Sequence, residues 1–265
     1  MSITRRDILG IAAKTSLAGI VMETVGINAA SAAASAALPS LVAPKAKTLK
    51  ELQAALERAP RRRDFKEVPM ILTSPDQWDH EALSLVMNYK GRVKQVWDHT
   101  DLAGPWLNLM RNTLNCQVWS FKNPDFLTVS ATHGPAQLAL YDQYLWDKYK
   151  LAKLTKGKYA RNTFLDVPKA AHDDPDKFEN PYGVFSPKDN CITTLQARGV
   201  VFMACHNGVF ELSYKLHNKG VNPDKLTLPQ MVAEFTNHLI SGVVLTPGIV
   251  GTIPELQMKG FHYAR

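Results

Sequence analysis

Five short apolar runs recur along the chain, separated by longer segments whose apolar residues have helical spacing. The runs predict strands at residues 92–97, 126–131, 200–204, 241–245 and 261–264. The run at 200–204 is continuously apolar, as is typical of a parallel strand that is buried on both faces. The first four strands therefore each lead into a segment that is expected to form helix.

The helical pattern is clearest between these runs. It predicts helices at 105–119, 135–149, 190–198, 207–218, 223–237 and 249–259, and two earlier ones at 48–59 and from Ser74 to about Tyr89. Thr48 is a candidate cap for the first helix, and Pro60 ends it. Strands that alternate with helices specify an α/β fold, here a three-layer α/β/α domain with a mostly parallel five-stranded sheet.

Two stretches fall outside this alternation. Residues 38–91 are predicted to form an N-terminal helical extension, and residues 153–188 are polar and rich in proline without a sustained period. We interpret 153–188 as a long, irregular surface insertion within an α/β domain that spans 92–265.

The N-terminus carries the features of an export signal. Arg5 and Arg6 precede a mildly apolar run at 8–25 and a small-residue tract at 29–37. This order predicts a Tat signal peptide over residues 1–37 and a periplasmic protein; the alternative is an uncleaved amphipathic helix. Two charged residues interrupt the apolar run, so no stable membrane insertion is expected.

Composition narrows the class of protein. The 265 residues include 31 Lys and Arg against 24 Asp and Glu, a formal charge of +7, but the basic residues are scattered except at 61–63. We therefore expect no nucleic-acid partner. No glycine-rich phosphate or dinucleotide fingerprint is present, so no cofactor is expected.

Polar residues that follow the predicted strands mark the candidate site, because ligands of such sheets bind at the carboxyl ends of the strands. They are Asp98, His99, His133, Gly134, Cys205, His206, Asn207, Pro247 and Gly248. Cys205 is the candidate nucleophile, because it follows a buried strand and precedes a helix whose N-terminal dipole favours a thiolate. His133 or His206 would lower the pKa of this thiol. The alternative is that Cys205 is a small buried hydrophobe.

Two other interpretations use the remaining cysteines and histidines. Cys191, at the start of the helix that leads into the third strand, is expected near Cys205 but unbridged, as a potential resolving thiol. Cys116 is expected in the core. His99, His133 and Cys205 would form a metal site only if their side chains converge, and we assign no metal.

Three segments together resemble the DsrE/DsrF-like family in its exported, Tat-signal branch, which is related to the TusD/DsrE sulfur-relay proteins. They are 127–149 (LTVSATHGPAQLALYDQYLWDKY), 198–207 (RGVVFMACHN) and 246–263 (TPGIVGTIPELQMKGFHY), within a match that covers about 92–265. The resemblance implies a five-stranded α/β/α domain that assembles into trimers or hexamers. It also implies that Cys205 carries persulfide sulfur between donor and acceptor proteins, with His133 and Asn207 at the edge of its pocket.

Two hypotheses from different classes follow, and whether the chain is an enzyme stays open. The first is a periplasmic sulfur-handling or thiol-redox protein centred on Cys205. The second is a non-catalytic oligomeric module that binds a small anion or a partner protein at the same edge, or a His/Cys metal-binding protein. A Cys205 pKa near or above the free value of about 8.5 would exclude the first.

Overall fold

The computed structural model describes residues 38–265, which form one compact unit. The predicted signal peptide at 1–37 lies outside the described residues. The strands are β1 Lys94–His99, β2 Leu127–Thr132, β3 Val201–Cys205, β4 Val244–Thr246 and β5 His262–Ala264. The helices are α1 Thr48–Arg58, α2 His80–Met87, α3 Trp106–Asn115, α4 Gln143–Lys148, α5 Ile192–Ala197, α6 His206–Asn218, α7 Leu228–Asn237 and α8 Ile249–Met258.

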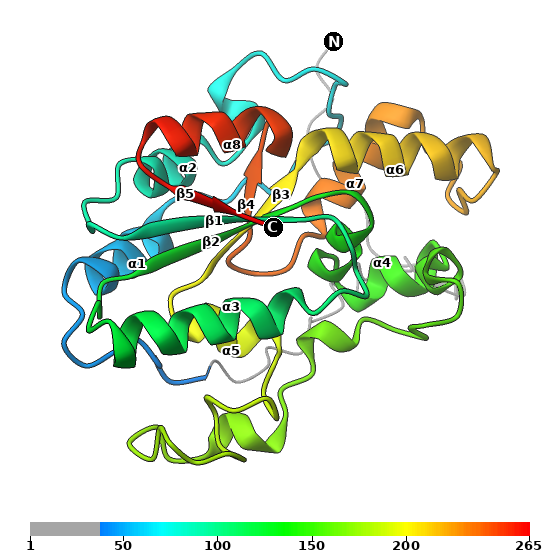
Figure 1. The fold of residues 1–265 in the computed structure, drawn as a ribbon. Coiled ribbons are helices and arrows are strands. Elements are labelled where there is room, and N and C mark those ends of the chain that lie inside the picture. Colours follow the sequence, from blue (N-terminus) through cyan, green and yellow to red (C-terminus); the bar gives the residue numbers. More distant parts are fainter. Residues whose placement is uncertain (1–37) are drawn as a thin grey trace, which may run out of the picture. The chain divides into compact units, whose positions relative to one another are not determined.

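The five strands form one sheet in the order β4-β3-β2-β1-β5, and every neighbouring pair is parallel. The predicted α/β class with a three-layer α/β/α arrangement is thus confirmed (Figure 1). Each strand begins later than its apolar run predicts. β1 consequently contains Asp98 and His99, so these neighbours point to opposite faces of the sheet.

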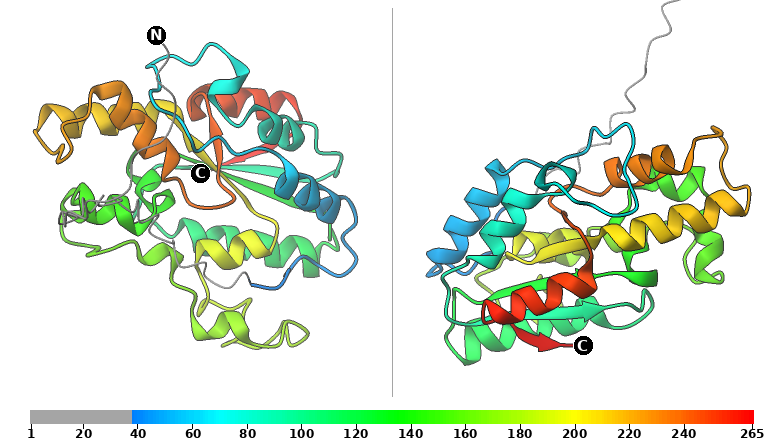
Figure 2. Two further views of the ribbon diagram at one scale, coloured as in Figure 1. Left: turned by 180° about the vertical axis from the view of Figure 1, so that it is seen from behind. Right: turned by 90° about the horizontal axis from the view of Figure 1, so that it is seen from above.

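Helices cover both faces of the sheet (Figures 1 and 2). On one face, which we call the α8 face, α1, α2 and α8 pack against strand residues such as Val96, Val129 and Met203. On the other, which we call the α3 face, α3, α4, α5 and α7 pack against Trp97 and Phe202. The helices at 38–91 therefore form part of one layer and are not an appendage.

The start of α1 is held by a distant residue. Asp125 accepts hydrogen bonds from the backbone N–H groups of Lys47 (2.8 Å) and Leu49 (2.9 Å). The predicted cap Thr48 lies within the helix, so that assignment was wrong. The Asp125 carboxylate satisfies donors that would otherwise lack a partner at a helix start.

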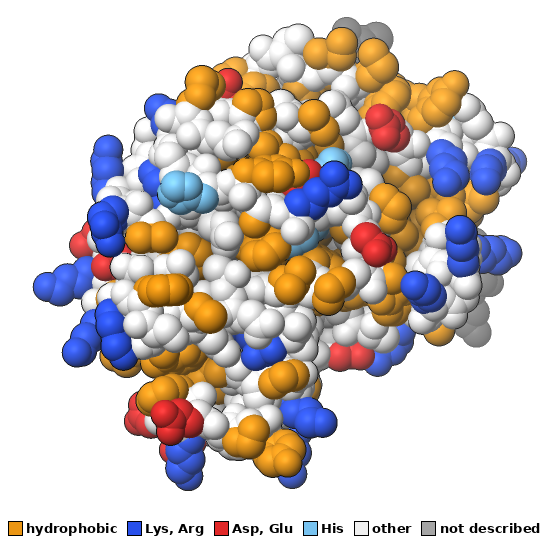
Figure 3. Space-filling model, in the orientation of Figure 1, with side chains coloured by type: hydrophobic (Ala, Val, Ile, Leu, Met, Phe, Trp, Pro, Cys, Tyr) orange, Lys and Arg blue, Asp and Glu red, His pale blue; other side chains and the backbone are white. Residues whose placement is uncertain are grey.

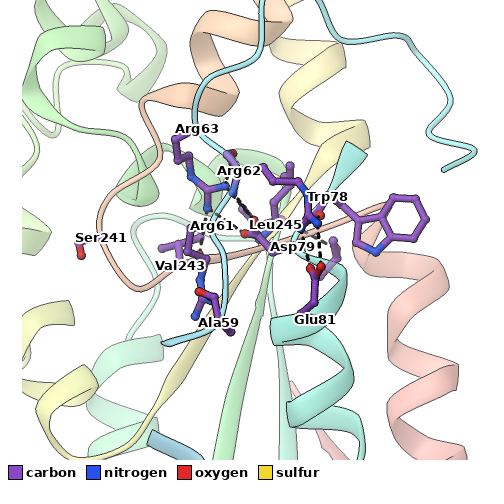
Figure 4. A network of polar contacts seen from close by, with 12 residues as sticks. Ala59, Arg61, Arg62, Arg63, Trp78, Asp79, Glu81, Ser241, Val243 and Leu245 are labelled. Carbon is purple, nitrogen blue, oxygen red and sulfur yellow. Dashed lines mark hydrogen bonds and ion pairs between the residues drawn. The ribbon is translucent and has the colours of Figure 1, made fainter. Parts of the chain in front are cut away.

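The basic run at 61–63 packs against the open edge of β4 (Figure 4). Arg63 forms an ion pair of 2.9 Å with fully buried Asp79 and donates to Val243 O at 3.0 Å. Asp79 in turn accepts from Leu245 N at 2.7 Å. Arg63 and Asp79 thus occupy backbone hydrogen-bonding groups along this edge, which would otherwise be free to pair with a strand of another chain. On the face drawn in Figure 3, the Lys and Arg side chains are scattered and do not form one continuous patch.

The helix predicted at 135–149 is interrupted. A 3-10 turn at Gly134–Leu140 ends before Tyr141, which forms an antiparallel bridge with Leu239. α4 then begins, with Asp142 as its cap at 3.0 Å from Leu145 N. Because Tyr141 is fully buried, its packing overrides the helical period of the surrounding sequence.

The insertion at 153–188 contains short 3-10 turns and neither an α-helix nor a strand, as predicted. It is not confined to the surface, however. Phe185 is buried, and Phe178 stacks on Trp119 with 5.3 Å between ring centroids. Part of the insertion therefore forms a wall of the domain. No helix within residues 38–265 combines the length and the apolar character needed to cross a membrane.

Candidate functional site

Three predicted residues meet on the α8 face at the carboxyl ends of neighbouring strands. Asp98 in β1 pairs with Ala131 in β2, which pairs with Met203 in β3. Because side chains alternate, His133 and Cys205, each two residues further on, face the same way. The paired register of β2 and β3 ends at Thr132 and Ala204, so His133 and Cys205 are the next residues along each chain at this edge of the sheet.

The sulfur of Cys205 lies where two helices begin. Sγ accepts a hydrogen bond from Gly208 N (3.4 Å) in the first turn of α6 and another from Ile249 N (3.3 Å), the first residue of α8. Both helix dipoles place partial positive charge there, which favours an anion. The residue is nevertheless only 4% exposed.

Burial opposes ionisation of this thiol. Burial raises the pKa of Cys205, and the backbone donors of Ile249, Gly208 and Asn207 offset only part of that rise. The pKa therefore stays above its ordinary value, so the closed site does not hold the low-pKa thiol that the carrier hypothesis requires, and the thiol is protonated at neutral pH.

Gln137, which the sequence analysis missed, fixes the backbone at Cys205. Its amide accepts from Cys205 N at 3.0 Å and donates to Cys205 O at 3.1 Å. A Cβ on Gly208 would lie 2.9 Å from the Gln137 carbonyl oxygen, so a larger residue at 208 would displace this contact. Only the proline-opened turn after His133 marked this region in the sequence.

His133 is paired with a carboxylate. Its Nε2 lies 2.7 Å from one Asp98 oxygen, and the Tyr263 hydroxyl donates to the other at 2.7 Å. Burial raises the pKa of Asp98, but the hydrogen bonds from Tyr263 and His133 outweigh it and leave the pKa below its usual value. Tyr263 was also missed, because only the sheet order brings β5 beside β1. His133 makes no hydrogen bond with Cys205.

His206 is directed elsewhere. It is fully buried, and Nε2 donates to the backbone carbonyl oxygens of Pro69 (2.9 Å) and Met70 (3.1 Å). Burial lowers the pKa of His206. It makes no hydrogen bond with the Cys205 sulfur, so the structure offers no route by which it tunes the thiol.

His99 points to the α3 face. Its ring lies 5.7 Å from the Trp97 ring and 5.1 Å from the Trp106 ring, and Nδ1 is 2.8 Å from Ser130 Oγ. Burial lowers the pKa of His99 to about 4. The metal alternative of His99, His133 and Cys205 is therefore not assembled. Residues 38–265 contain no other group of three or more His, Cys, Asp and Glu placed to hold a metal ion.

The remaining predicted residues form the rim around Cys205. Exposed Asn207 lies against Gly248, where a Cβ would come 2.8 Å from the Asn207 amide nitrogen. Pro247 is half-buried beside it, and Gly134 is exposed with a φ of 55°. The Asn207 side chain, at the start of α6, thus lies against the turn that begins α8.

Cys191 lies on the other side of the sheet. It caps α5, which packs on the α3 face, and its sulfur accepts from Thr194 N at 3.4 Å. Burial and nearby Asp189 raise the pKa of Cys191 to about 11, despite opposing hydrogen bonds from Thr194. All three cysteines are free. The expected proximity of Cys191 to Cys205 was wrong, and so was the core position of Cys116, which is exposed.

Comparisons of the chain with protein-family models, with curated proteins and with solved structures give no match.

Proposed function

We propose that the chain is an exported DsrE-like protein in which Cys205 carries sulfur as a persulfide or takes part in thiol redox chemistry. The observation that carries this proposal is the convergence of two helix N-termini on the Cys205 sulfur. Backbone N–H groups at helix starts stabilise thiolate and persulfide anions alike. The Asp98–His133 pair on the same edge supplies a group that can accept a proton.

The proposed step is a transfer of one neutral sulfur atom. The Cys205 thiolate attacks the outer sulfur of a donor persulfide, R–S–SH, and forms a new S–S bond. The donor S–S bond breaks, and R–S⁻ leaves with the electron pair. Cys205 becomes Cys–S–SH, and the exchange involves no net oxidation or reduction.

This step requires movement, because Cys205 is buried and its thiol is protonated in the closed site. Separation of the two turns at 205–208 and 246–249 would expose the sulfur while leaving it at the start of a helix. Asn207, which lies against the second of these turns, is the side chain that must be displaced.

The burial of the sulfur favours a second candidate function. A non-catalytic module that binds a small anion or a partner protein at this edge needs no reactive thiol. In such a module, Cys205 would serve only as the cap of α6.

Sulfur loading separates the two functions. The folded protein is incubated with glutathione persulfide, and each cysteine peptide is analysed by mass spectrometry. The carrier proposal predicts the mass of one added sulfur atom on Cys205, and its absence from buried Cys191. Exposed Cys116 reports non-specific loading within the same sample, and Cys205→Ser is the matched control. Loading of Cys116 alone would contradict the carrier function and leave the binding module.

Assembly and export belong to the same proposal. A trimer or hexamer is expected by light scattering, whereas a monomer at micromolar concentration would contradict it. The apolar helix faces around Tyr141 and Phe235 predict a subunit interface there, but both residues are fully buried within the protomer and pack edge to face. They therefore cannot form that interface.

Replacement of Arg5 and Arg6 by lysine should retain the protein in the cytoplasm, and normal export would refute the Tat assignment.

A further inference from the structure

A second site lies at the opposite end of the sheet from Cys205. A cavity of about 310 Å³ opens near the residues that precede β2 and β3, including Phe126 and Arg198. Its volume falls at the lower end of the range of about 300–1,000 Å³ that small-molecule pockets occupy. Nothing in the function proposed for Cys205 uses it.

Two segments outside the family resemblance build the walls. The N-terminal segment at 40–44 forms one side and is fixed by a hydrogen bond of 2.8 Å from Leu41 N to Ala197 O. The insertion supplies Phe178 and Phe185, which pack on Trp119 with centroid distances of 5.3 and 4.6 Å. Apart from two charged side chains, the lining is mainly apolar and aromatic.

One of these charged side chains, Arg198, is buried. The residue is 4% exposed, and its guanidinium carbon lies 4.7 Å from the centre of the Phe185 ring and 5.6 Å from that of Trp119. Nη2 donates to Asn115 Oδ1 at 2.8 Å. Nη1 is buried and has no hydrogen-bond partner among residues 38–265. A buried donor without an acceptor is unfavourable by about 1–3 kcal/mol, so the group lacks an acceptor that a ligand could supply.

The charges around Arg198 do not balance. Burial and neighbouring Arg111 lower the pKa of Arg198 to about 9, so that it remains protonated at neutral pH. Asp189 is the carboxylate whose charge acts on both arginines. Asp176, the other charged residue of the lining, is exposed, so water screens its charge. One buried positive charge is left for a ligand to neutralise.

We propose that this cavity binds a small monocarboxylic acid with an apolar body, whose carboxylate pairs with Arg198. An arginine beside aromatic walls offers both a charged partner and apolar surface to such a ligand. A closed apolar cavity of about 150 Å³ holds one benzene molecule. A cavity twice that size accommodates a body of roughly ten to twelve carbon atoms.

Binding is tested by isothermal titration calorimetry on the folded protein with two probes, 2-naphthoate and octanoate. Their neutral counterparts, 2-naphthamide and octanamide, report the contribution of the charge. At least one acid should bind with one-to-one stoichiometry and about tenfold to a hundredfold more tightly than its amide. If neither acid binds, or if acid and amide bind equally, the proposal is wrong.

Variants assign the binding to this cavity. In Arg198→Gln, the binding affinity of the acid should fall to that of the amide. Because Arg198 is buried, its replacement puts folding at risk, so Val118→Trp provides a second test by filling the cavity from its wall. Val250→Trp, at a 70% exposed position on α8, is the matched control and should bind like the wild type. Unchanged binding in Val118→Trp would overturn the assignment, whatever the outcome for Cys205.

Discussion

The two faces of the sheet carry the same pair of residue types in different surroundings. The α8 face has Cys205 and His133 at its carboxyl edge, whereas Cys191 and His99 belong to the α3 face. His133 pairs with a carboxylate and remains partly exposed. His99 lies beside two indole rings with its Nε2 buried and unpaired.

The two buried cysteines differ in the same way. Each caps a helix, but the Cys205 sulfur also accepts a hydrogen bond from the start of a second helix. The second partner of the Cys191 sulfur is the Thr194 hydroxyl at 3.1 Å, within the same helix, and nearby Asp189 disfavours the Cys191 thiolate. A cysteine at a helix start is therefore not identified as reactive by that position alone. The donors and charges that other elements bring to the sulfur also determine whether its thiolate is stabilised.

The largest expected effect concerns His99. Its pKa is about 4 in the folded protein and about 6.5 when unfolded, so the unfolded chain binds a proton first as the pH falls. The stability contributed by neutral His99 is complete above pH 6.5 and is lost between there and pH 4. The loss should reach about 3 kcal/mol, measured by urea unfolding at several pH values.

His99→Gln should flatten this pH dependence, whatever its own stability at pH 7. The exposed His172 offers the matched control, because His172→Gln should keep the wild-type dependence. If His99→Gln and the wild type lose stability in parallel from pH 7 to pH 4, then His99 is not held neutral by its aromatic surroundings.

Removal of the two sulfur acceptors should have unequal effects. Cys205→Ala leaves donors of two helices without an acceptor and should lower the free energy of unfolding by about 2 kcal/mol. Cys191→Ala removes the cap of one helix and should lower it by about 1 kcal/mol. In Cys205→Ser the hydroxyl can accept in place of the sulfur, so part of the loss should be recovered. Equal losses in the two alanine variants would mean that the contact from Ile249 contributes nothing.

A smaller effect is expected at the rim. Asn207→Ala removes the side chain that lies against the start of α8, so alkylation of Cys205 by iodoacetamide should become about fivefold faster, equivalent to about 1 kcal/mol. Cys191 should react at its wild-type rate. Asn218→Ala, at the other end of α6, is the control. A rate for Cys205 that does not change would show that Asn207 does not cover the sulfur.

The sequence predicted the sheet because each parallel strand is a short apolar run, and it placed Cys205 correctly at the end of one. The sequence could not show to which face of the sheet each polar residue at a strand end points. The first strand was predicted at 92–97, which places His99 after its end and beside His133. β1 instead runs to His99, so the side chain of His99 points to the α3 face and that of His133 to the α8 face. The partners Tyr263 and Gln137 come from β5 and from the turn after β2. Only the tertiary arrangement brings such residues to the site.

The same limit applies to the cavity. Arg198 reads in the sequence as the end of a helix, and the segments at 40–44 and 175–185 have no periodic pattern. These segments come together because the insertion packs around Trp119, and the periodicity of the sequence does not predict such long-range packing.

The central claim is that two helix starts make Cys205 the reactive thiol of the chain. Its most direct test is the alkylation rate of all three cysteines in the folded protein from about pH 6 to about pH 10, resolved by peptide mass spectrometry. The account predicts that Cys205 reacts faster than Cys191 at every pH, although burial holds the pKa of Cys205 above its ordinary value while the site is closed. A rate for Cys205 no greater than that of Cys191 would contradict the carrier function and leave a binding module.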